Sequence, residues 1–308
     1  MVPITLAPNV RLLETRHGSL FVLTTDNSVG RALLNYGEWT FGEIELVRKF
    51  LRPGDYVLDI GANIGTHAIP LAKAVGHEGQ VIAFEPQPCI FELLTANTLV
   101  NGLSNLRCIC AGCGAQTASI GLPDTDYGTN GDFGSMALGP LLKAPDQSSS
   151  NVRIPVMAID DVFTSKALRL IKIDVEGMEI DVLRGAEQTI RRLRPILYIE
   201  NEWPDPSEPV LRAVRDLGYR SFWHVEPLYN PKNFFGEQRN IFGVAHCINN
   251  LCIPVELTLE PVGLKEISST SDHPRKTLLE RALKLKAKAA MAHCARGFAC
   301  IQIGRAHV

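Results

Sequence analysis

Short apolar runs alternate with segments of helical periodicity through most of the chain. Unbroken apolar runs indicate buried strands, whereas apolar positions three and four apart indicate helices. The pattern predicts strands at residues 56–60, 80–84, 106–111, 168–175 and 195–200, with helices at 66–75, 88–100, 179–193 and 207–217. Such alternation is typical of an α/β fold in which a mainly parallel sheet carries helices on both faces.

The two ends of this pattern depart from it. Residues 10–35 are expected to form a short β region with a hairpin turn at residues 17–18, followed by a helix at 43–51. Near the other end, residues 219–225 and 240–246 are strand-like with no helix between them. Neighbouring strands without a crossover helix predict an antiparallel hairpin at the edge of the sheet.

Two further segments stand outside the alternation. Residues 124–152 are polar and rich in Gly, Asp and Ser, and a loop this long in a compact domain is usually functional or mobile. Residues 274–292 are rich in Lys, Arg, Ala and Leu and predict a helix outside the main core. We therefore expect an N-terminal β region at 1–40, a main domain at 41–260 and a C-terminal helical extension at 261–308.

The last six residues of the chain, 303–308, back-translate to a common sequencing-adapter sequence. We therefore expect the natural reading frame to run into adapter sequence near Gln302, so that the true C-terminus is missing. These residues are left out of the fold prediction.

The charge balance excludes several kinds of partner. The chain has 31 Lys and Arg against 33 Asp and Glu, so it presents no basic surface for nucleic acid or an anionic membrane. It lacks an apolar run of about 18 residues and an N-terminal signal pattern. We expect a cytoplasmic protein with free thiols, no membrane span and no nucleic-acid partner. The sequence leaves its oligomeric state open.

The strongest chemical signal follows the strand predicted at 56–60 and reads Asp59-Ile60-Gly61-Ala62-Asn63-Ile64-Gly65. Gly61 and Gly65 allow the backbone to turn sharply and approach a ligand, while Asp59 and Asn63 offer polar contacts. A carboxylate such as Asp59 suits the amino group and sulfonium of S-adenosylmethionine. We therefore place Asp59, Gly61, Asn63 and Gly65 in a cofactor site.

A second acidic residue, Glu85, ends the next predicted strand and is followed by Pro86 and Gln87. A carboxylate at this position can accept both hydroxyls of a ribose, and Gln87 would lie beside the adenosine. Enzymes that bind NAD use G-x-G-x-x-G, whose middle glycine leaves space for a pyrophosphate. That glycine is absent from the 59–65 loop, which favours S-adenosylmethionine because it has no phosphate.

Together with a third block, these residues give the chain a resemblance to the FkbM-type S-adenosylmethionine-dependent methyltransferases. The three blocks are residues 59–65, 84–86 and 171–179, the last extended by 182–186 and 195–200. The resemblance implies a class I methyltransferase, Rossmann-like fold with a seven-stranded sheet whose last strand is antiparallel. It also implies O-methylation, typically of a sugar or polyketide hydroxyl, and makes 41–260 the catalytic domain. It does not identify the substrate.

Methyl transfer to a hydroxyl requires an aligned acceptor and a group that removes its proton. Ligands in open α/β sheets lie beyond the carboxyl ends of the strands, so we expect Asp174 and Glu176 to act there as general base or acceptor clamp. His224 ends a later strand and is a natural base near neutral pH. The alternative is a structural Lys172–Asp174 ion pair with Glu176 capping the next helix.

Two questions of function stay open in the sequence. Asp174, Glu200 and Asn201 would suit a divalent metal if they converged, but the sequence does not show convergence and we predict no metal. The predicted activity is an O-methyltransferase (EC 2.1.1) acting on a hydroxyl of a carbohydrate or secondary metabolite. A small-molecule N-methyltransferase is an alternative, although the Asn/Asp-Pro-Pro-Tyr signature is absent. A non-catalytic adenosyl-binding scaffold is another, against which the intact 59–65 loop counts.

Overall fold

A computed structural model describes residues 7–143, 152–269 and 273–278 of the chain. Its strands are β1 (Val10–Thr15), β2 (Gly18–Leu23), β3 (Tyr56–Ile60), β4 (Gln80–Phe84), β5 (Leu106–Ile109), β6 (Gly112–Cys113), β7 (Ala118–Gly121), β8 (Arg153–Met157), β9 (Leu170–Ile173), β10 (Ile196–Glu200), β11 (Tyr219–Pro227), β12 (His246–Pro254) and β13 (Lys265–Glu266). Its helices are α1 (Val29–Tyr36), α2 (Phe41–Arg48), α3 (Ala68–Val75), α4 (Pro88–Val100), α5 (Gly139–Lys143), α6 (Ile159–Val162), α7 (Glu179–Gly185), α8 (Glu187–Leu193) and α9 (Pro204–Asp216).

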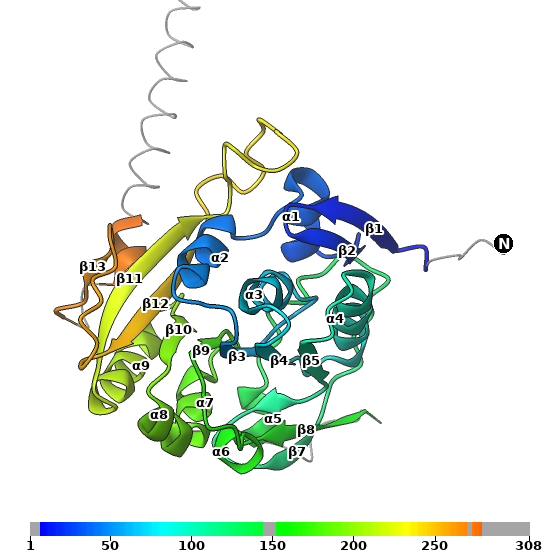
Figure 1. The fold of residues 1–308 in the computed structure, drawn as a ribbon. Coiled ribbons are helices and arrows are strands. Elements are labelled where there is room, and N and C mark those ends of the chain that lie inside the picture. The colour runs from blue at the N-terminus through cyan, green and yellow to red at the C-terminus, as the bar shows by residue number, and fades with distance from the viewer. Residues whose placement is uncertain (1–6, 144–151, 270–272, 279–308) are drawn as a thin grey trace, which may run out of the picture.

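The central sheet has the strand order β13-β11-β12-β10-β9-β3-β4-β5 (Figure 1). Every pairing from β10 to β5 is parallel. β12 is antiparallel to both of its neighbours and lies between β10 and β11. The predicted mostly parallel α/β sheet with an antiparallel hairpin towards one edge is therefore confirmed.

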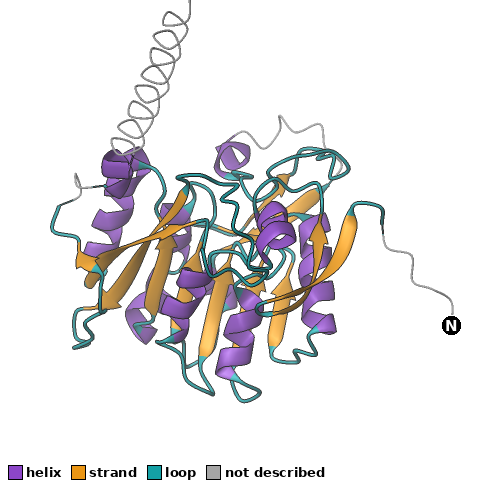
Figure 2. Ribbon diagram, turned by 90° about the horizontal axis from the view of Figure 1, so that it is seen from above, coloured by secondary structure: helices purple, strands orange, loops and turns teal. Residues whose placement is uncertain are grey.

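Helices cover both faces of this sheet, with α2, α3 and α4 on one face and α7, α8 and α9 on the other (Figures 1 and 2). Successive strand residues point to opposite faces, so each strand supplies two cores. Val57 belongs to the core that contains Ile69 of α3 and Leu94 of α4, whereas Leu58 packs with Val182 of α7. Burial on both faces explains why these strands read as unbroken apolar runs.

The N-terminal region consists of a β-hairpin followed by a helix. β1 and β2 form the predicted hairpin, but helix α1 follows where the β region was predicted to continue to residue 35. Its buried residues Val29, Leu33 and Tyr36 are spaced four and three apart, which is helical periodicity. The helix ends at Gly37, whose φ of 66° gives the left-handed conformation common at helix ends.

The second strand of the C-terminal hairpin begins later than predicted. Residues 240–245 form a turn that leads into β12, which begins at His246. Asn240 holds this turn, because its Oδ1 accepts the N–H groups of Phe242 and Gly243 at 3.0 and 2.7 Å. Gly243 has a φ of 62°, which an extended strand does not allow. The strand predicted at residues 240–246 is therefore wrong except at His246, where β12 begins.

Between β5 and β9 the chain forms a second sheet with the order β6-β8-β7. The polar stretch predicted at 124–152 contains α5, and residues 144–151 within it lie outside the described ranges. The single helix predicted at 179–193 is two helices, α7 and α8, which meet at Ala186.

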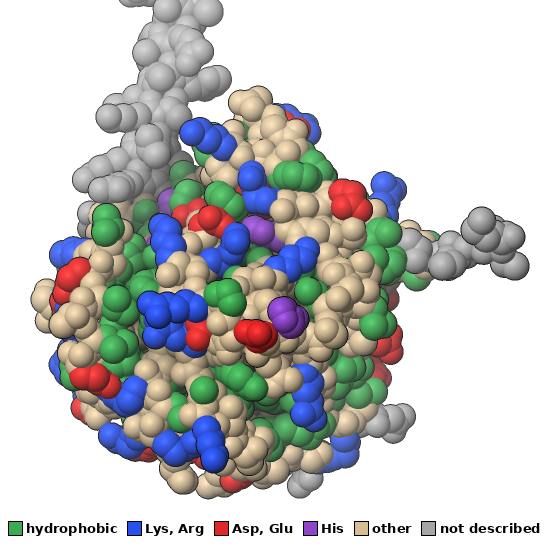
Figure 3. Space-filling view, viewed as in Figure 1, with side chains coloured by type: hydrophobic (Ala, Val, Ile, Leu, Met, Phe, Trp, Pro, Cys, Tyr) green, Lys and Arg blue, Asp and Glu red, His purple; other side chains and the backbone are tan. Residues whose placement is uncertain are grey.

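The C-terminal extension is described only in part. Residues 274–278 are helical, while the rest of the helix predicted at 274–292 and residues 303–308 lie outside the described residues. Among the described residues, no helix has the length and apolar character needed to cross a bilayer. On the face shown in Figure 3, Lys and Arg side chains are interspersed with acidic, apolar and uncharged surface. The boundaries at residues 40 and 260 stay predictions.

Candidate active site

A cavity of about 310 Å³ opens at the carboxyl ends of the central strands. This volume suits a small molecule, and the position is where open α/β sheets bind their ligands. Its walls come from the loops after β3, β4, β5, β9 and β10, from α2, and from the start of β12. The predicted site residues that line it are Gly61, Asn63, Glu85, Pro86, Gln87, Asp174 and Glu176, whereas Asp59, Gly65 and His224 do not.

The glycines of the 59–65 loop are required by close packing. Gly61 has a φ of 82°, and a Cβ at this position would collide with the carbonyl oxygen of Asp174. A Cβ at Gly65, which has a φ of 95°, would lie 2.9 Å from Leu94 Cδ1. Gly61 therefore brings the loop after β3 against the loop after β9 at the cavity, while Gly65 packs the loop onto α4 beneath it.

Glu85 lies buried at the end of β4 with both carboxylate oxygens held by backbone. Oε2 accepts the N–H of Asn63 at 3.0 Å, and Oε1 accepts the N–H of Gln87 at 2.9 Å. Burial raises the pKa of Glu85 to about 7, although these two hydrogen bonds oppose the rise. A carboxylate fixed in this way still has lone pairs to offer two vicinal hydroxyls.

The polar segment predicted as a functional loop contributes to the same wall. Gln87 Nε2 donates to the carbonyl oxygen of Phe133 at 2.6 Å, and the Tyr127 hydroxyl donates to Gln87 Oε1 at 2.9 Å. Residues within 132–138 line the cavity beside Glu85. The segment therefore closes the side of the cavity formed by β4 and β5.

The structure places Asp59 beneath the cavity. Its side chain has no exposed surface and lies 3.3 Å from Lys172 Nζ. Lys172 also pairs with Asp174 at 3.2 Å and donates to the carbonyl oxygen of Gly61 at 3.3 Å. Burial alone would lower the pKa of Lys172, but Asp174 and Asp59 together raise it. Asp59 therefore supports the loop through Lys172, and its place outside the cavity lining does not support the predicted direct contact with the cofactor.

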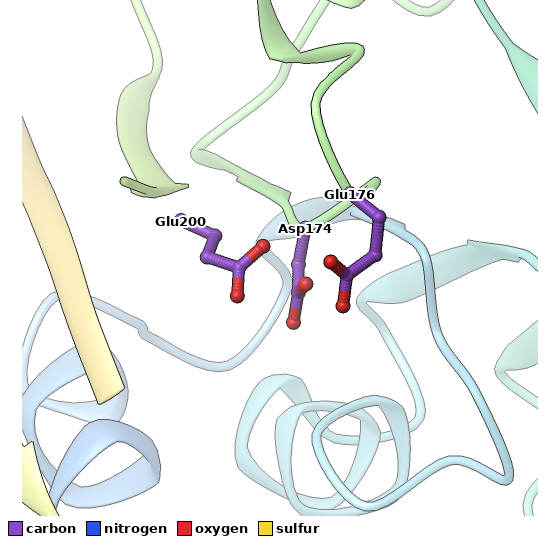
Figure 4. A group of neighbouring side chains, drawn as sticks. All are labelled: Asp174, Glu176 and Glu200. Carbon is purple, nitrogen blue, oxygen red and sulfur yellow. The ribbon is translucent and has the colours of Figure 1, made fainter. Parts of the chain in front are cut away.

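Three carboxylates meet at the opposite wall (Figure 4). Asp174 and Glu176 follow β9 and Glu200 ends β10, and one oxygen of each lies within 4.8 Å of the others. Although burial favours the neutral acid, Lys172 holds the pKa of Asp174 below its usual value. Burial and then Asp174 raise the pKa of Glu176 to about 8, and the same causes hold the pKa of Glu200 well above its usual range. Of the three, Asp174 therefore loses its proton most readily, while Glu176 and Glu200 keep theirs to a higher pH than an ordinary glutamate does.

This group differs from the oxygen ligands considered in the sequence. Glu176 takes the place expected for Asn201, whose Nδ2 instead donates to Asn250. The ion pair between Lys172 and Asp174, which was the alternative to a catalytic role, is present. Glu176 does not cap α7, because Met178 stands at the N-cap position of this helix and no side chain of the described residues makes a cap hydrogen bond there.

His224 is buried in β11 away from the cavity lining. Its Nδ1 lies 2.7 Å from the hydroxyl of Tyr198, a buried residue of β10. Burial lowers the pKa of His224, although Glu43 opposes the change. In this position the imidazole joins two strands, so the geometry does not support the prediction that His224 is the base.

Sequence reasoning missed a second histidine, which does line the cavity. His67 Nε2 lies 3.3 Å from Glu43 Oε2 and 3.4 Å from Thr40 Oγ1. Glu43 Oε1 in turn accepts the Nδ2–H of Asn249 at 2.9 Å. Thr66 lies next to His67 in the lining. Their position directly after the 59–65 loop, at the start of a helix, was the available signal.

Comparison with known protein families gives one domain match. The methyltransferase FkbM domain matches residues 59–221, which is more than half of the chain. That range begins at Asp59 within β3 and extends into β11, so it contains Glu85 and the three carboxylates.

Two curated proteins illustrate the similarity. The 31-O-demethyl-FK506 methyltransferase FkbM of Streptomyces tacrolimicus is 28% identical over 205 residues, covering 58% of this chain and 78% of that protein. The hexuronic acid methyltransferase AglP of Haloferax volcanii is 25% identical over 178 residues, covering 54% of this chain and 66% of that protein. Among solved structures, a methyltransferase FkbM from Methylobacillus flagellatus aligns over 71% of this chain and 52% of its own, with 18% identity and a TM-score of 0.39.

Proposed function

The chain belongs to the FkbM methyltransferase family and is an S-adenosylmethionine-dependent methyltransferase, and we propose that it methylates a hydroxyl of a carbohydrate or secondary metabolite. The names of two relatives support this acceptor class, since one acts on 31-O-demethyl-FK506 and the other on a hexuronic acid. The proposal rests above all on one observation. A single cavity joins the buried Glu85 to the carboxylates of Asp174, Glu176 and Glu200.

The residues of this cavity fit the cofactor. Glu85 is buried, backbone-held and open to the cavity, as a ribose-binding carboxylate must be. Gly61 removes the Cβ that would prevent the loop after β3 from meeting the loop after β9. Gln87, Ala111 and Gly112 form the adjoining wall, where the adenine would lie. When bound, S-adenosylmethionine supplies a methyl group on an activated sulfonium leaving group.

The chain's own residues then position the acceptor and move its proton. Asp174 is ionised and accepts a hydrogen bond from the acceptor, which orients the hydroxyl. Glu176 in its ionised form would take the proton of the acceptor hydroxyl as that oxygen receives the methyl group that the bound cofactor would supply. A carboxylate whose pKa is raised to about 8 is a stronger base than an ordinary glutamate.

Calorimetry with S-adenosylhomocysteine and S-adenosylmethionine tests the cofactor site. Wild-type protein is expected to bind both compounds, and Glu85→Ala to lose about 1.5–3 kcal/mol of binding free energy because hydrogen bonds to a charged group are removed. Folding of the variant is checked by circular dichroism. A folded wild-type protein that ignores both compounds at millimolar concentration would overturn the proposal.

The acceptor is tested with radiolabelled methyl groups. The enzyme is incubated with S-adenosylmethionine and a panel of hexoses, hexuronic acids, amino sugars and hydroxylated macrolactones, and each product is analysed by mass spectrometry and NMR. Methyl groups found on oxygen support the proposal. Methylation confined to the nitrogen of an amino sugar would replace it with N-methyl transfer.

A further inference from the structure

The loop between β10 and α9 borders the carboxylate side of the cavity. It contains Asn201, Glu202 and Trp203, and it directly follows Glu200. Glu202 lines the cavity together with Glu176 and Glu200. The same three glutamates also line a smaller cavity of about 130 Å³, whose walls include Asn201 and Trp203. The position of this loop therefore sets the shape of the space around the carboxylates.

Each residue of this loop is held by the C-terminal segment 273–278. His273 Nε2 donates to the carbonyl oxygen of Asn201 at 2.9 Å. The guanidinium of Arg275 pairs with the carboxylate of Glu202 and donates to the Glu202 carbonyl oxygen at 3.3 Å. The same guanidinium lies 3.8 Å from the centre of the Trp203 ring, which is a cation–π contact. The conformation of the loop therefore depends on two residues from a distant part of the chain.

His273 is itself fixed in one position and one form. It is 2% exposed, and its ring lies edge-on to Trp223 of β11 with ring centres 4.9 Å apart. Its Nδ1 accepts the backbone N–H of Arg275 at 3.1 Å, and the Asn201 carbonyl oxygen requires a hydrogen on Nε2. Burial lowers the pKa of His273, although the Asn201 carbonyl opposes the change. Burial therefore favours the neutral imidazole, in which both ring nitrogens are used.

Glu202 connects this segment to the sheet and to the carboxylates. Its Oε1 faces Arg275, and its Oε2 accepts the backbone N–H of Ile248 in β12 at 3.2 Å. After burial and Asp174, the charge of Glu202 is among the causes that raise the pKa of Glu176. The other carboxylates that act in this direction are Asp132 and Glu179. Arg275 therefore offsets a negative charge that acts on the proposed base.

We propose that His273 and Arg275 are positioning residues for the acceptor side of the active site, acting through the loop 201–203 and the Glu202 carboxylate. Both lie beyond residues 59–221, so the site draws on chain outside the matched family domain. The inference rests on the proposed function, because it takes the side of the cavity with Glu176 and Glu200 as the acceptor side. It leaves cofactor binding independent of the C-terminal segment.

Carboxyl carbon NMR on full-length protein with isotope-labelled glutamate tests this link without an acceptor. The resonance of Glu176 is assigned by its loss in Glu176→Gln, and its titration gives the pKa. Arg275→Gln is expected to raise that pKa, because the charge of Glu202 then lacks its cation. Arg275→Lys is expected to return it close to the wild-type value. Arg212→Gln removes an exposed ion pair with Glu208 on α9, and as the matched control it is expected to change nothing.

Hydrogen exchange and calorimetry separate the loop from the cofactor site. His273→Leu and Arg275→Gln are expected to speed amide exchange in residues 201–203, while the 59–65 loop exchanges as in wild type. Affinity for S-adenosylhomocysteine is expected to stay within about twofold of wild type. With the acceptor found by the radiolabel assay, kcat/KM is expected to fall by about 10- to 100-fold, since misplaced groups around an acceptor slow transfer.

The outcomes distinguish this inference from the proposed function. Arg275→Gln keeps the test valid if His273→Leu does not fold, because the Arg275 side chain is partly exposed. An unchanged Glu176 pKa together with unchanged exchange in residues 201–203 would overturn the inference. So would a loss of S-adenosylhomocysteine affinity as large as the loss of turnover. Failure of wild-type protein to bind S-adenosylhomocysteine would instead reject the proposed function.

Discussion

Glu176 combines a neighbouring negative charge with a backbone conformation that is uncommon for glutamate. It stands beside an ionised carboxylate, Asp174, and its backbone has a φ of 53°, which places it in the left-handed region. Non-glycine residues in that region are uncommon and concentrate at functional sites. The backbone turns the side chain into the cavity, where burial and Asp174 make the proton hard to remove.

This proton predicts the pH dependence of turnover. Because Glu176 acts as base only when ionised, kcat is expected to rise as pH increases through about 8, the value to which burial and Asp174 raise its pKa. Steady-state rates from pH 6 to 9.5 measure the profile. Glu176→Gln is expected to lower kcat by about 100- to 10,000-fold and to remove this limb. Retention of the limb in Glu176→Gln would assign the titration to another group.

The same proton predicts how stability depends on pH. A carboxyl whose folded-state pKa is raised above its unfolded value stabilises the fold at low pH, and that contribution is lost as pH rises through the folded-state pKa. The loss for Glu176 therefore extends from its ordinary value of 4.5 to about 8. Thermal unfolding is expected to show Glu176→Gln more stable than wild type at pH 9. Each kcal/mol corresponds to about 2–4 °C in a domain of this size.

Asp181→Asn, which removes an exposed carboxylate of α7, is the control and is expected to shift the midpoint equally at pH 5 and pH 9. An advantage of Glu176→Gln that is the same at both pH values would contradict the assigned cause.

At the residue scale, the sequence anticipates that Glu85 lies at the cavity but not that Asp59 lies beneath it. Glu85 ends a strand and its neighbours Pro86 and Gln87 follow in the same wall, so its position alone carries the prediction. Asp59 lies within β3 and faces Lys172 of the adjacent strand β9. Which charges pair across a parallel sheet depends on the register of strands more than 100 residues apart, and local sequence does not contain that register.

At the scale of elements, Lys172 of β9 contacts β3 and its loop through the carboxylate of Asp59 and the carbonyl oxygen of Gly61. The same ammonium group also pairs with the carboxylate of Asp174. Lys172→Met would leave Asp59 buried without a cation. Removing one partner of a buried ion pair costs about 3–5 kcal/mol, and urea denaturation is expected to show a loss of that size. Arg184→Met removes an exposed ion pair with Asp181 and is the matched control, with an expected loss below about 1 kcal/mol. Equal losses in the two variants would contradict this role.

The contact between β10 and β11 gives a second prediction at this scale. His224→Ala leaves the buried Tyr198 hydroxyl without its partner, which costs about 1–3 kcal/mol of unfolding free energy. Adding Tyr198→Phe removes the stranded hydroxyl and is expected to restore part of that loss, as measured by denaturation. Cofactor affinity is expected to stay unchanged, because His224 does not line the cavity. A large fall in turnover without loss of stability would instead support His224 as the base.

The sequence predicts the ends of a strand correctly where both faces of that strand are buried. β3 and β4 have the predicted bounds because each apolar run ends at the loop that carries the chemistry. The start of β12 was misplaced because residues 241–245 are apolar enough for a strand, yet the Asn240 side chain and Gly243 hold them in a turn. Turn chemistry outweighed hydrophobic pattern at this position.

At the scale of the whole molecule, the cavity is closed by segments far apart in sequence. Residues 132–138 cover the Glu85 side, α2 and the start of α3 form the opposite side, and β12 supplies Asn249. S-adenosylhomocysteine is expected to slow amide exchange in 132–138, because a bound ligand suppresses opening of the segments that contact it. Hydrogen exchange with mass spectrometry measures this, and β7, which does not line the cavity, is the internal reference. Equal slowing in both segments would contradict direct contact.

The position of β12 has a consequence for synthesis of the protein. Among the strands of the described residues it is the last long one to be made, yet it lies inside the sheet between β10 and β11. While residues 246–254 remain in the ribosome, the nascent chain exposes the unpaired backbone groups along the edges of both strands and lacks the amide that holds Glu43. Such an intermediate is prone to aggregate, so the final stage of translation is the point at which chaperone binding would matter most for this fold.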